Sequence, residues 1–248
     1  MITLKTQEEI KIIAEGGKIL VVALKELEKI AKPGITTLEL DKVAEVFILS
    51  HGAKPAFKNY EGFPFSLCAS VNENIVHGYP SNYVLKDGDV LKLDLGVLYK
   101  GFNTDSAITV AIGNVSYETK RLINVTKKSL RLGIKKAKIG NTVGDIGNTV
   151  QRFVEDQGFG VVRDLCGHGI GKTVHEDPKI PNFGKRGGGE KLVEGMVICI
   201  EPMVTAGDYN LIKSDDGYGY ATRDNGLSAH FEHTIAITKK GPRVLTEL

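Results

Sequence analysis

The sequence repeats itself, and an internal repeat restricts a chain to folds built from two similar halves. Residues 31–36 read AKPGIT and residues 137–142 read AKIGNT, an offset of 106 residues. Thr36 stands three residues before Glu39, and Thr142 stands three residues before Asp145. This spacing is typical of a capping box, so each threonine is expected to begin a helix.

Further helices are expected on either side of the two copies. Helix-like segments at 7–31 and 117–138 precede them, and the helices begun by the threonines are expected to end near Gly52 and Gly158. Glycine just after a helix is a common end signal.

Two pairs of predicted strands extend the match. Residues 87–94 (DGDVLKLD) resemble 194–201 (EGMVICIE), and residues 105–111 (DSAITVA) resemble 232–238 (EHTIAIT). We therefore predict one domain, 1–248, with helix-helix-strand-strand halves of roughly 1–113 and 114–248 related by a pseudo-twofold. The predicted fold class is α+β, with an antiparallel or mixed sheet and helices on one side.

The matched strands carry four acids: Asp94, Asp105, Glu201 and Glu232. Apolar residues alternate with Asp94 along 91–97, so its carboxylate is expected on the face opposite the core. If Tyr99 and Lys100 form the turn, Asp94 lies directly opposite Asp105 in the next strand.

Facing carboxylates repel each other unless a positive charge compensates them. A single acid is most simply interpreted as a solvated surface charge. Four acids at repeat-related positions beside apolar strands instead predict a cleft that holds two divalent cations, as in two-metal hydrolases.

Composition excludes several other classes. A net charge of +2 gives no support for a nucleic-acid or membrane-surface partner. Three widely spaced cysteines without a CxxC pair argue against a disulfide framework or a zinc ribbon, and favour a reducing cytosol. No apolar run approaches the length of a membrane span, and the first residues do not form a signal peptide. We expect a cytoplasmic protein.

Three histidines are candidates for a metal ligand or for substrate contacts. His168 lies in CGHGIG, which we interpret as a glycine-rich turn, and His77 and His175 lie in VHGYP and VHEDP. The residues alone leave open which histidine binds metal. His230 shares a strand face with Glu232 and is interpreted as a residue at the rim of the cleft.

The motifs resemble those of a known family. VNENIVHGYP, LDLG followed by TDSA, CGHGIGKTVHEDP, ICIEPMV and HFEHTIAIT are similar to the signature segments of type I methionine aminopeptidases. The resemblance runs in order over nearly the whole chain and implies the pita-bread fold.

The resemblance also implies the roles of individual residues. Asp94 would chelate one metal, Asp105 and Glu232 would bridge both, and His168 and Glu201 would complete the shell of the other. His77 and His175 would contact substrate, and Glu201 would also act as general base. The side-chain pocket would be formed by Tyr60, Phe63, Cys68 and Tyr218, with Phe57 nearby. A monovalent cation would bind backbone carbonyls near Asn72, Asn74 and Ser228.

The implied activity is removal of the initiator methionine from nascent proteins when the second residue is small. A water or hydroxide bridging the metals would attack the scissile carbonyl, and the metals would be Co, Mn, Fe or Zn. Implied partners are the N-termini of nascent chains, with ribosome association as a further expectation. We also expect a monomer.

Some positions depart from the family pattern. Asn103 and Thr104 replace a usual His-Gly pair, and Glu61, Val174 and Tyr218 replace a common His, Phe and Trp. These departures concern the shape of the pocket, since none of them removes a predicted ligand.

Two rival interpretations remain. An Xaa-Pro aminopeptidase or prolidase shares the fold and the ligand set, but such chains generally carry an additional N-terminal domain. A non-catalytic pita-bread binding protein would have lost metal ligands, whereas all five predicted positions are filled here.

Overall fold

The computed structural model describes residues 2–247, and its helices follow the repeat. They are α1 (Gln7–Ile30), α2 (Thr37–Ser50), α3 (Tyr117–Lys136) and α4 (Val143–Glu155), with a short 3-10 helix η1 (Tyr60–Gly62). Thr36 and Thr142 each form the predicted capping box. Their side chains accept from the backbone N–H three residues on, so the two helix starts are confirmed.

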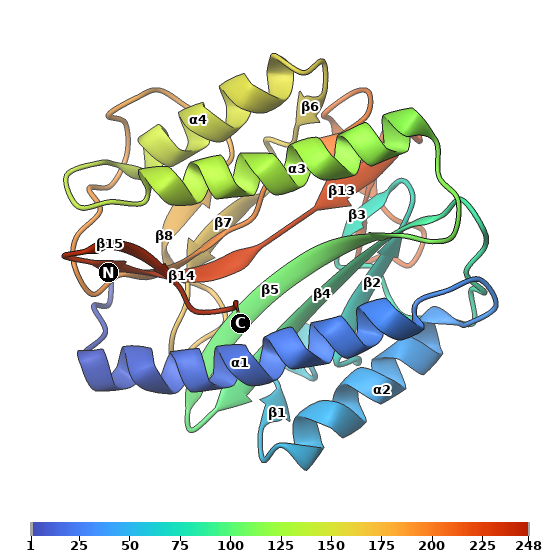
Figure 1. The fold of residues 1–248 in the computed structure, drawn as a ribbon, viewed down its shortest axis with the longest axis horizontal. Coiled ribbons are helices and arrows are strands. Elements are labelled where there is room, and N and C mark those ends of the chain that lie inside the picture. The colour runs from blue at the N-terminus through green and yellow to red at the C-terminus, as the bar shows by residue number, and fades with distance from the viewer. Residues whose placement is uncertain (1, 248) are drawn as a thin grey trace.

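The larger sheets belong one to each half (Figure 1). The first contains β1 (Lys54–Pro55), β2 (Leu67–Val71), β4 (Val90–Tyr99) and β5 (Phe102–Ala111). The second contains β7 (Cys166–Gly169), β8 (Glu176–Pro181), β9 (Val197–Ile200), β14 (His233–Thr238) and β15 (Gly241–Val244). All strand pairs within the described residues are antiparallel, which confirms one of the two expected arrangements.

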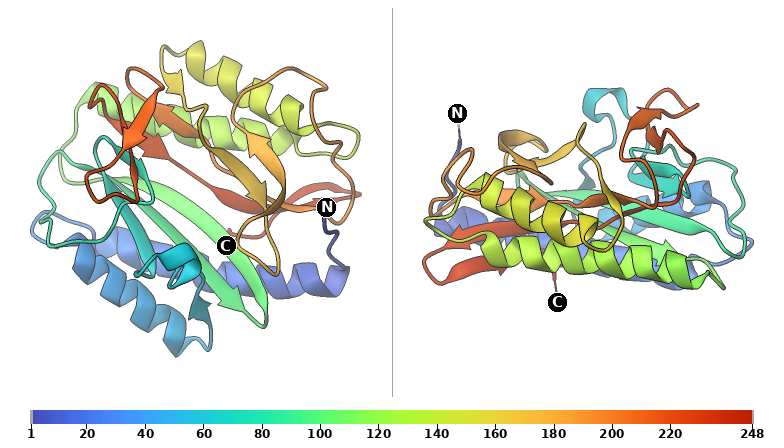
Figure 2. Two further views of the ribbon diagram at one scale, coloured as in Figure 1. Left: turned by 180° about the vertical axis from the view of Figure 1, so that it is seen from behind. Right: turned by 90° about the horizontal axis from the view of Figure 1, so that it is seen from above.

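Two three-stranded sheets complete the structure. One contains β6 (Gly160–Val161), β10 (Met203–Thr205) and β13 (Ser228–His230), and the other contains β3 (Asn74–Val76), β11 (Leu211–Lys213) and β12 (Tyr220–Thr222). In the view from above, α3 runs along one side of the strands, and β11 and η1 stand on the other (Figure 2). The helices therefore leave one side of the strands open for a site.

Each half has its own hydrophobic core. In the first half, Leu91, Leu93 and Leu95 pack with residues of α1 and α2, and Asp94 faces away from these helices. In the second half, Ile198 and Ile200 pack with residues of α3 and α4. Side chains alternate along a strand, so burying one set of residues against the helices presents the other set to the open side.

The hairpin between β4 and β5 has a register two residues away from the predicted one. Tyr99 pairs with Phe102, so Lys100 and Gly101 form the turn, with φ of 48° and 82°. A two-residue hairpin turn of this type needs positive φ at both residues, which a bulky Tyr99 disfavours. Asp94 therefore pairs with Ala107, and the prediction that it lies directly opposite Asp105 was wrong. A shift of two residues keeps each side chain on its face, so both carboxylates still point to the same side.

The two halves meet where β5 runs beside the segment that leads into β14 (Figure 1). The Asp105 N–H donates to Thr234 Oγ1 at 3.0 Å, and Thr234 Oγ1 donates to the Asp105 carbonyl at 2.7 Å. Ser106 Oγ donates to the Glu232 carbonyl at 2.7 Å, and the Glu232 N–H donates to the Ala107 carbonyl at 3.0 Å. We call these contacts the seam; they place Asp105 and Glu232, one from each half, beside each other.

Within residues 2–247, none of the helices has the length and the apolar character that crossing a lipid bilayer requires.

Replacing Thr234 by Val should lower the free energy of unfolding by roughly 2–3 kcal/mol, because it leaves the buried N–H and carbonyl of Asp105 without their partner. Urea unfolding measures this loss. Thr149→Val removes a hydroxyl that bonds within α4 and should stay within about 0.5 kcal/mol of the parent. Equal effects of the two substitutions would contradict the role given to the seam.

Candidate metal centre

Four carboxylates converge on one buried cleft. Asp94 and Asp105 come from β4 and β5, while Glu201 directly follows β9 and Glu232 directly precedes β14. Ile200 pairs with His233, so the next positions, Glu201 and Glu232, face each other as the strands continue. The four residues are between 2 and 9 % exposed, and all of them line a cleft of about 800 Å³.

The pKa values of all four acids are raised. Burial is the largest cause for all four, and it raises the pKa of Asp105 and Glu232 well above the usual range. For Asp105, the charges of Glu232, Asp94 and Glu201 add to this effect. Asp94 Oδ1, Asp105 Oδ1 and Glu232 Oε1 are buried without a hydrogen-bond partner. Buried acceptor oxygens that face one another are stable as anions only beside a positive charge.

His168 points an unprotonated nitrogen at the acids. Its Nδ1 lies 2.9 Å from the Gly169 carbonyl, which only accepts, so Nδ1 carries the proton and Nε2 the lone pair. Nε2 lies 3.5 Å from Glu201 Oε1 and 4.0 Å from Asp105 Oδ2. Burial lowers the pKa of His168 to about 3, which keeps the ring neutral. A neutral imidazole oriented by a backbone carbonyl is typical of a metal ligand.

The segment around His168 is a strand, not the predicted glycine-rich turn. Residues 166–169 form β7, which pairs with β8 and β9. The glycines serve close strand packing, because a Cβ at Gly167 would lie 2.3 Å from the Cys199 carbonyl and one at Gly169 2.1 Å from the Asp177 carbonyl. A rigid strand fixes the position of His168 more firmly than a turn would.

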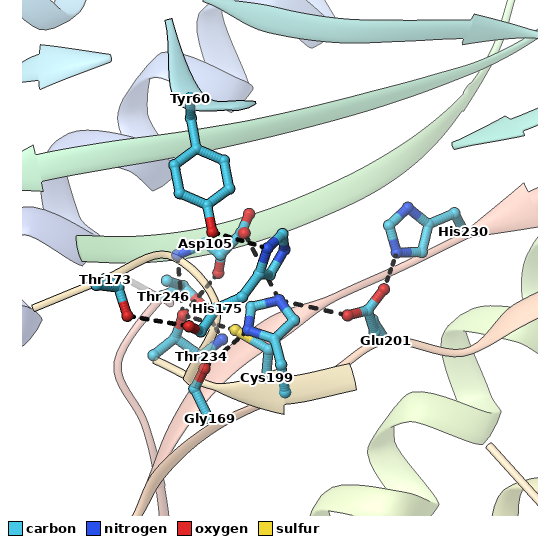
Figure 3. A network of polar contacts seen from close by, with 11 residues as sticks. Tyr60, Asp105, Gly169, Thr173, His175, Cys199, Glu201, His230, Thr234 and Thr246 are labelled. Atoms are coloured by element: carbon cyan, nitrogen blue, oxygen red, sulfur yellow. Dashed lines mark hydrogen bonds and ion pairs between the residues drawn. The ribbon is translucent and has the colours of Figure 1, made fainter. Parts of the chain in front are cut away.

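His230 lies inside the site and not at its rim. It is 1 % exposed, and its Nε2 is 3.6 Å from Glu201 Oε2 (Figure 3). Burial lowers its pKa to about 4. The prediction failed because β13 pairs with β10 and also packs against α3, β3, β4 and β5, and no local pattern reveals contacts between segments so far apart in the sequence.

The other two candidate histidines border the same cleft. The His175 ring contacts His168 edge to face at 4.5 Å between centroids, and its Nδ1 lies 3.2 Å from the Tyr60 hydroxyl (Figure 3). His77 contacts Tyr218 with 6.2 Å between ring centroids. Burial lowers the pKa of His77 to about 4 and also lowers that of His175, so both rings are neutral donors or acceptors at neutral pH.

The predicted pocket residues form an apolar wall of the cleft. Cys68 pairs with Asp94 across β2 and β4, and Phe63 and Tyr218 have ring centroids 5.2 Å apart. Phe57 packs over Gly96, where a Cβ would lie 2.6 Å from its ring. Val174 is buried in the same cluster. Charged and apolar sides therefore meet within one cleft, as in a site that binds a side chain beside a reactive centre.

Asn103, one of the departures from the family pattern, connects β5 to the loop before His175. Its Nδ2 donates to the carbonyls of Gly171 and Lys172 at 3.0 and 3.1 Å. The substitution therefore affects the support of this loop, since Asn103 itself is not among the residues that line the cleft.

Two residues that the sequence interpretation did not single out also face the site side. Cys199, two residues before Glu201, has its Sγ close to ligand atoms of Asp105, His168 and Glu232. Lys92, two residues before Asp94, is 1 % exposed. The signal for both was the two-residue period of their strands, which places them on the same face as the acids. Burial and the charges of Glu232 and Asp105 raise the pKa of the Cys199 thiol well above its usual range.

The donor set fits divalent cations. Ligand atoms of Asp105, His168 and Glu232 lie within 4.8 Å of one another, and Asp94 and Glu201 line the same cleft. Carboxylates with one imidazole suit Mn, Fe, Co or Zn.

Comparison with known proteins agrees with this geometry. Residues 11–239 match metallopeptidase family M24. A methionine aminopeptidase from Clostridium perfringens is 51 % identical over 99 % of both chains. A methionine aminopeptidase structure from Rickettsia prowazekii has a TM-score of 0.98 and 40 % identity over the full length of both chains. The chain belongs to the methionine aminopeptidases of family M24. The resemblance and the pita-bread fold are thereby confirmed.

Structures of the rival class share the fold at a greater distance. The prolidase from Pyrococcus horikoshii has a TM-score of 0.79 and 26 % identity over 98 % of this chain, which spans 63 % of that prolidase. Membership of M24 makes the protein a metal-dependent hydrolase. The choice between its peptidase branches therefore rests on overall similarity, which favours the methionine aminopeptidases.

The raised carboxyl pKa values predict how the metal-free protein responds to pH. Because the folded state holds protons that the unfolded state releases, stability should fall as pH rises from about 4 through the folded pKa values. Glu232→Gln removes one of these charges. Without metal at pH 8 the variant should be more stable than the parent by about 1 kcal/mol or more, and the gain should shrink at pH 5.5.

Chemical unfolding in the presence of a chelator measures both effects. Added Mn²⁺ should stabilise the parent far more than the variant, and Glu190→Gln, at an exposed acid, serves as the control. A metal-free Glu232→Gln protein that is less stable than the parent at pH 8 would contradict the repulsion between the acids.

Proposed function

We propose that this protein removes the initiator methionine from nascent proteins whose second residue is small. The observation that most supports this proposal is the cleft itself, in which five side chains that can bind metal lie beside an apolar aromatic wall. Full-length similarity to methionine aminopeptidases supports the choice of substrate. Because nascent chains arise in the cytoplasm, we place the activity there; the monomeric state and ribosome association stay predictions.

Five residues would hold two divalent cations: Asp94, Asp105, His168, Glu201 and Glu232. When bound, such cations polarise the scissile carbonyl and lower the pKa of the attacking water. The four carboxylates balance four positive charges, which removes the repulsion that raises their pKa values. Mn, Fe, Co and Zn all suit this donor set.

Glu201 is placed to move protons during the reaction. Its Oε1 lies 3.5 Å from His168 Nε2 and its Oε2 lies 3.6 Å from His230 Nε2, so the carboxylate stands between two imidazole rings. Burial and the charge of Asp94 raise its pKa well above that of an exposed glutamate, and a base with a raised pKa accepts a proton more readily. We assign Glu201 the role of general base and proton shuttle.

His175 and His77 would contact the scissile peptide. If the Tyr60 hydroxyl donates to His175 Nδ1, the proton of the neutral ring lies on Nε2, which then donates to the developing oxyanion. His77 would hydrogen-bond the scissile amide nitrogen. Phe63, Cys68, Tyr218 and Tyr60 would surround the unbranched methionine side chain.

One peptide assay tests the substrate. After reconstitution with Mn²⁺ or Co²⁺, Met-Ala-Ser should be cleaved at least ten times faster than Met-Leu-Ser, and Xaa-Pro-Yaa peptides should not be cleaved. Cleavage of Xaa-Pro bonds would favour the prolidase alternative. Failure of the metal-free protein to take up micromolar Mn²⁺ or Co²⁺ would revive the non-catalytic interpretation.

His168→Ala should reduce bound metal and activity together, because it removes the imidazole ligand. Metal content after gel filtration and turnover of Met-Ala-Ser measure the two losses. Full activity with two bound metals in this variant would refute the assignment of His168.

His175→Ala should instead retain metal and lose about 10²–10³-fold in kcat, the usual cost of one oxyanion donor. The same two measurements separate it from His168→Ala. Loss of metal in His175→Ala would show that this ring supports the centre and not the substrate.

A further inference from the structure

Lys92 is a buried cation in the middle of an apolar strand. It lies on β4 between Ser70 of β2 and Thr109 of β5, with 1 % of its surface exposed. Lysine is almost never fully buried unless its ammonium has partners. Its long stem runs from the strand that carries Asp94 towards the turn between β2 and β3.

The ammonium ends on backbone carbonyls. Lys92 Nζ donates to the Asn72 carbonyl at 2.7 Å and to the Val90 carbonyl at 3.3 Å. The Asn72 carbonyl also accepts from the N–H of Ser228 at 3.1 Å and from its hydroxyl at 2.9 Å. Ser228 Oγ lies 3.3 Å from the Asn74 carbonyl as well. Lys92 therefore contacts the same group of residues at which the family resemblance implies a monovalent cation.

A bound monovalent cation does not fit beside this ammonium. A carbonyl oxygen has two lone pairs, and that of Asn72 already accepts three hydrogen bonds, one of them from a charged donor. A second positive charge a few ångströms away in a buried place would also be repelled strongly.

The electrostatic surroundings favour one cation here. The nearby carboxylates of Glu73 and Asp89 favour a positive charge at Lys92. Asp89 is itself fixed to this turn, because its Oδ1 accepts from Asn72 Nδ2 at 2.9 Å. The ammonium of Lys92 thus lies near two negative charges, those of Glu73 and Asp89.

We propose that the side chain of Lys92 replaces a bound monovalent cation in this protein. It holds the turn at Asn72, whose φ of 54° is left-handed, against Ser228 at the start of β13. The strand β13 ends at His230, next to Glu201, and Glu232 follows two residues later. Lys92 is a positioning residue, and the fold that it supports does not depend on Na⁺ or K⁺. This proposal is independent of the proposed peptidase activity.

Thermal unfolding of the full chain in matched salts tests it. The melting temperature of the parent should be the same in tetramethylammonium, sodium and potassium chloride at one ionic strength. Lys92→Ala opens the space and the carbonyls to an ion, so it should melt lower in tetramethylammonium chloride. It should regain roughly 4 °C or more in NaCl or KCl. Lys127→Ala, at an exposed lysine, controls for the loss of a charge.

Two results would overturn the proposal. The first is a parent protein whose melting temperature rises in Na⁺ or K⁺, since that requires a separate cation site. The second is a Lys92→Ala protein that responds to the salts as the parent does. If Lys92→Ala does not fold, the melting temperatures of Lys92→Met and of the parent in the three salts test the proposal instead. The methionine fills the same space without a donor, and it should lower the melting temperature equally in all three salts; a stability equal to that of the parent would overturn the proposal.

Discussion

The seam between β5 and the segment before β14 is the contact on which the site depends. Each half of the molecule builds its own sheet and its own helix-covered core, and neither half holds more than two of the four buried acids. The hydroxyls of Thr234 and Ser106 form hydrogen bonds with backbone groups across the seam. They take the place of the backbone ladder that a continuous sheet would have there. These few hydrogen bonds bring Asp105 and Glu232 together and so create the cleft.

That arrangement concentrates negative charge where little water remains. Burial and mutual repulsion raise the pKa values of the acids, and several of their oxygens have no hydrogen-bond partner. The stability that the fold loses in this way is recovered when divalent cations bind, so the features that make the site reactive also make it hold metal. Lys92 also places a positive charge near buried negative charges, but here the cation is the ammonium group of a side chain on β4.

Much of this was readable in the sequence because it depends on local periodicity. Capping boxes mark Thr36 and Thr142, and alternation along the strands places Asp94 and Glu201 on the face opposite the core. The register of the β4–β5 hairpin was misjudged, because it depends on which residues accept positive φ in the turn. The roles proposed for His77, His168 and His175 come from the family resemblance, since the residues around each histidine carry no local signal for its partner.

The sequence by itself determined the two-fold plan, the helix starts and the faces of the acids, since these follow from interactions between residues close along the chain. Only the tertiary structure decided which residues meet across the halves. It buried His230 beside Glu201, directed Nε2 of His168 to the acids, and brought Lys92 to the Asn72 carbonyl. These contacts join residues that lie 20 to 63 positions apart, and no periodicity encodes the packing that brings them together.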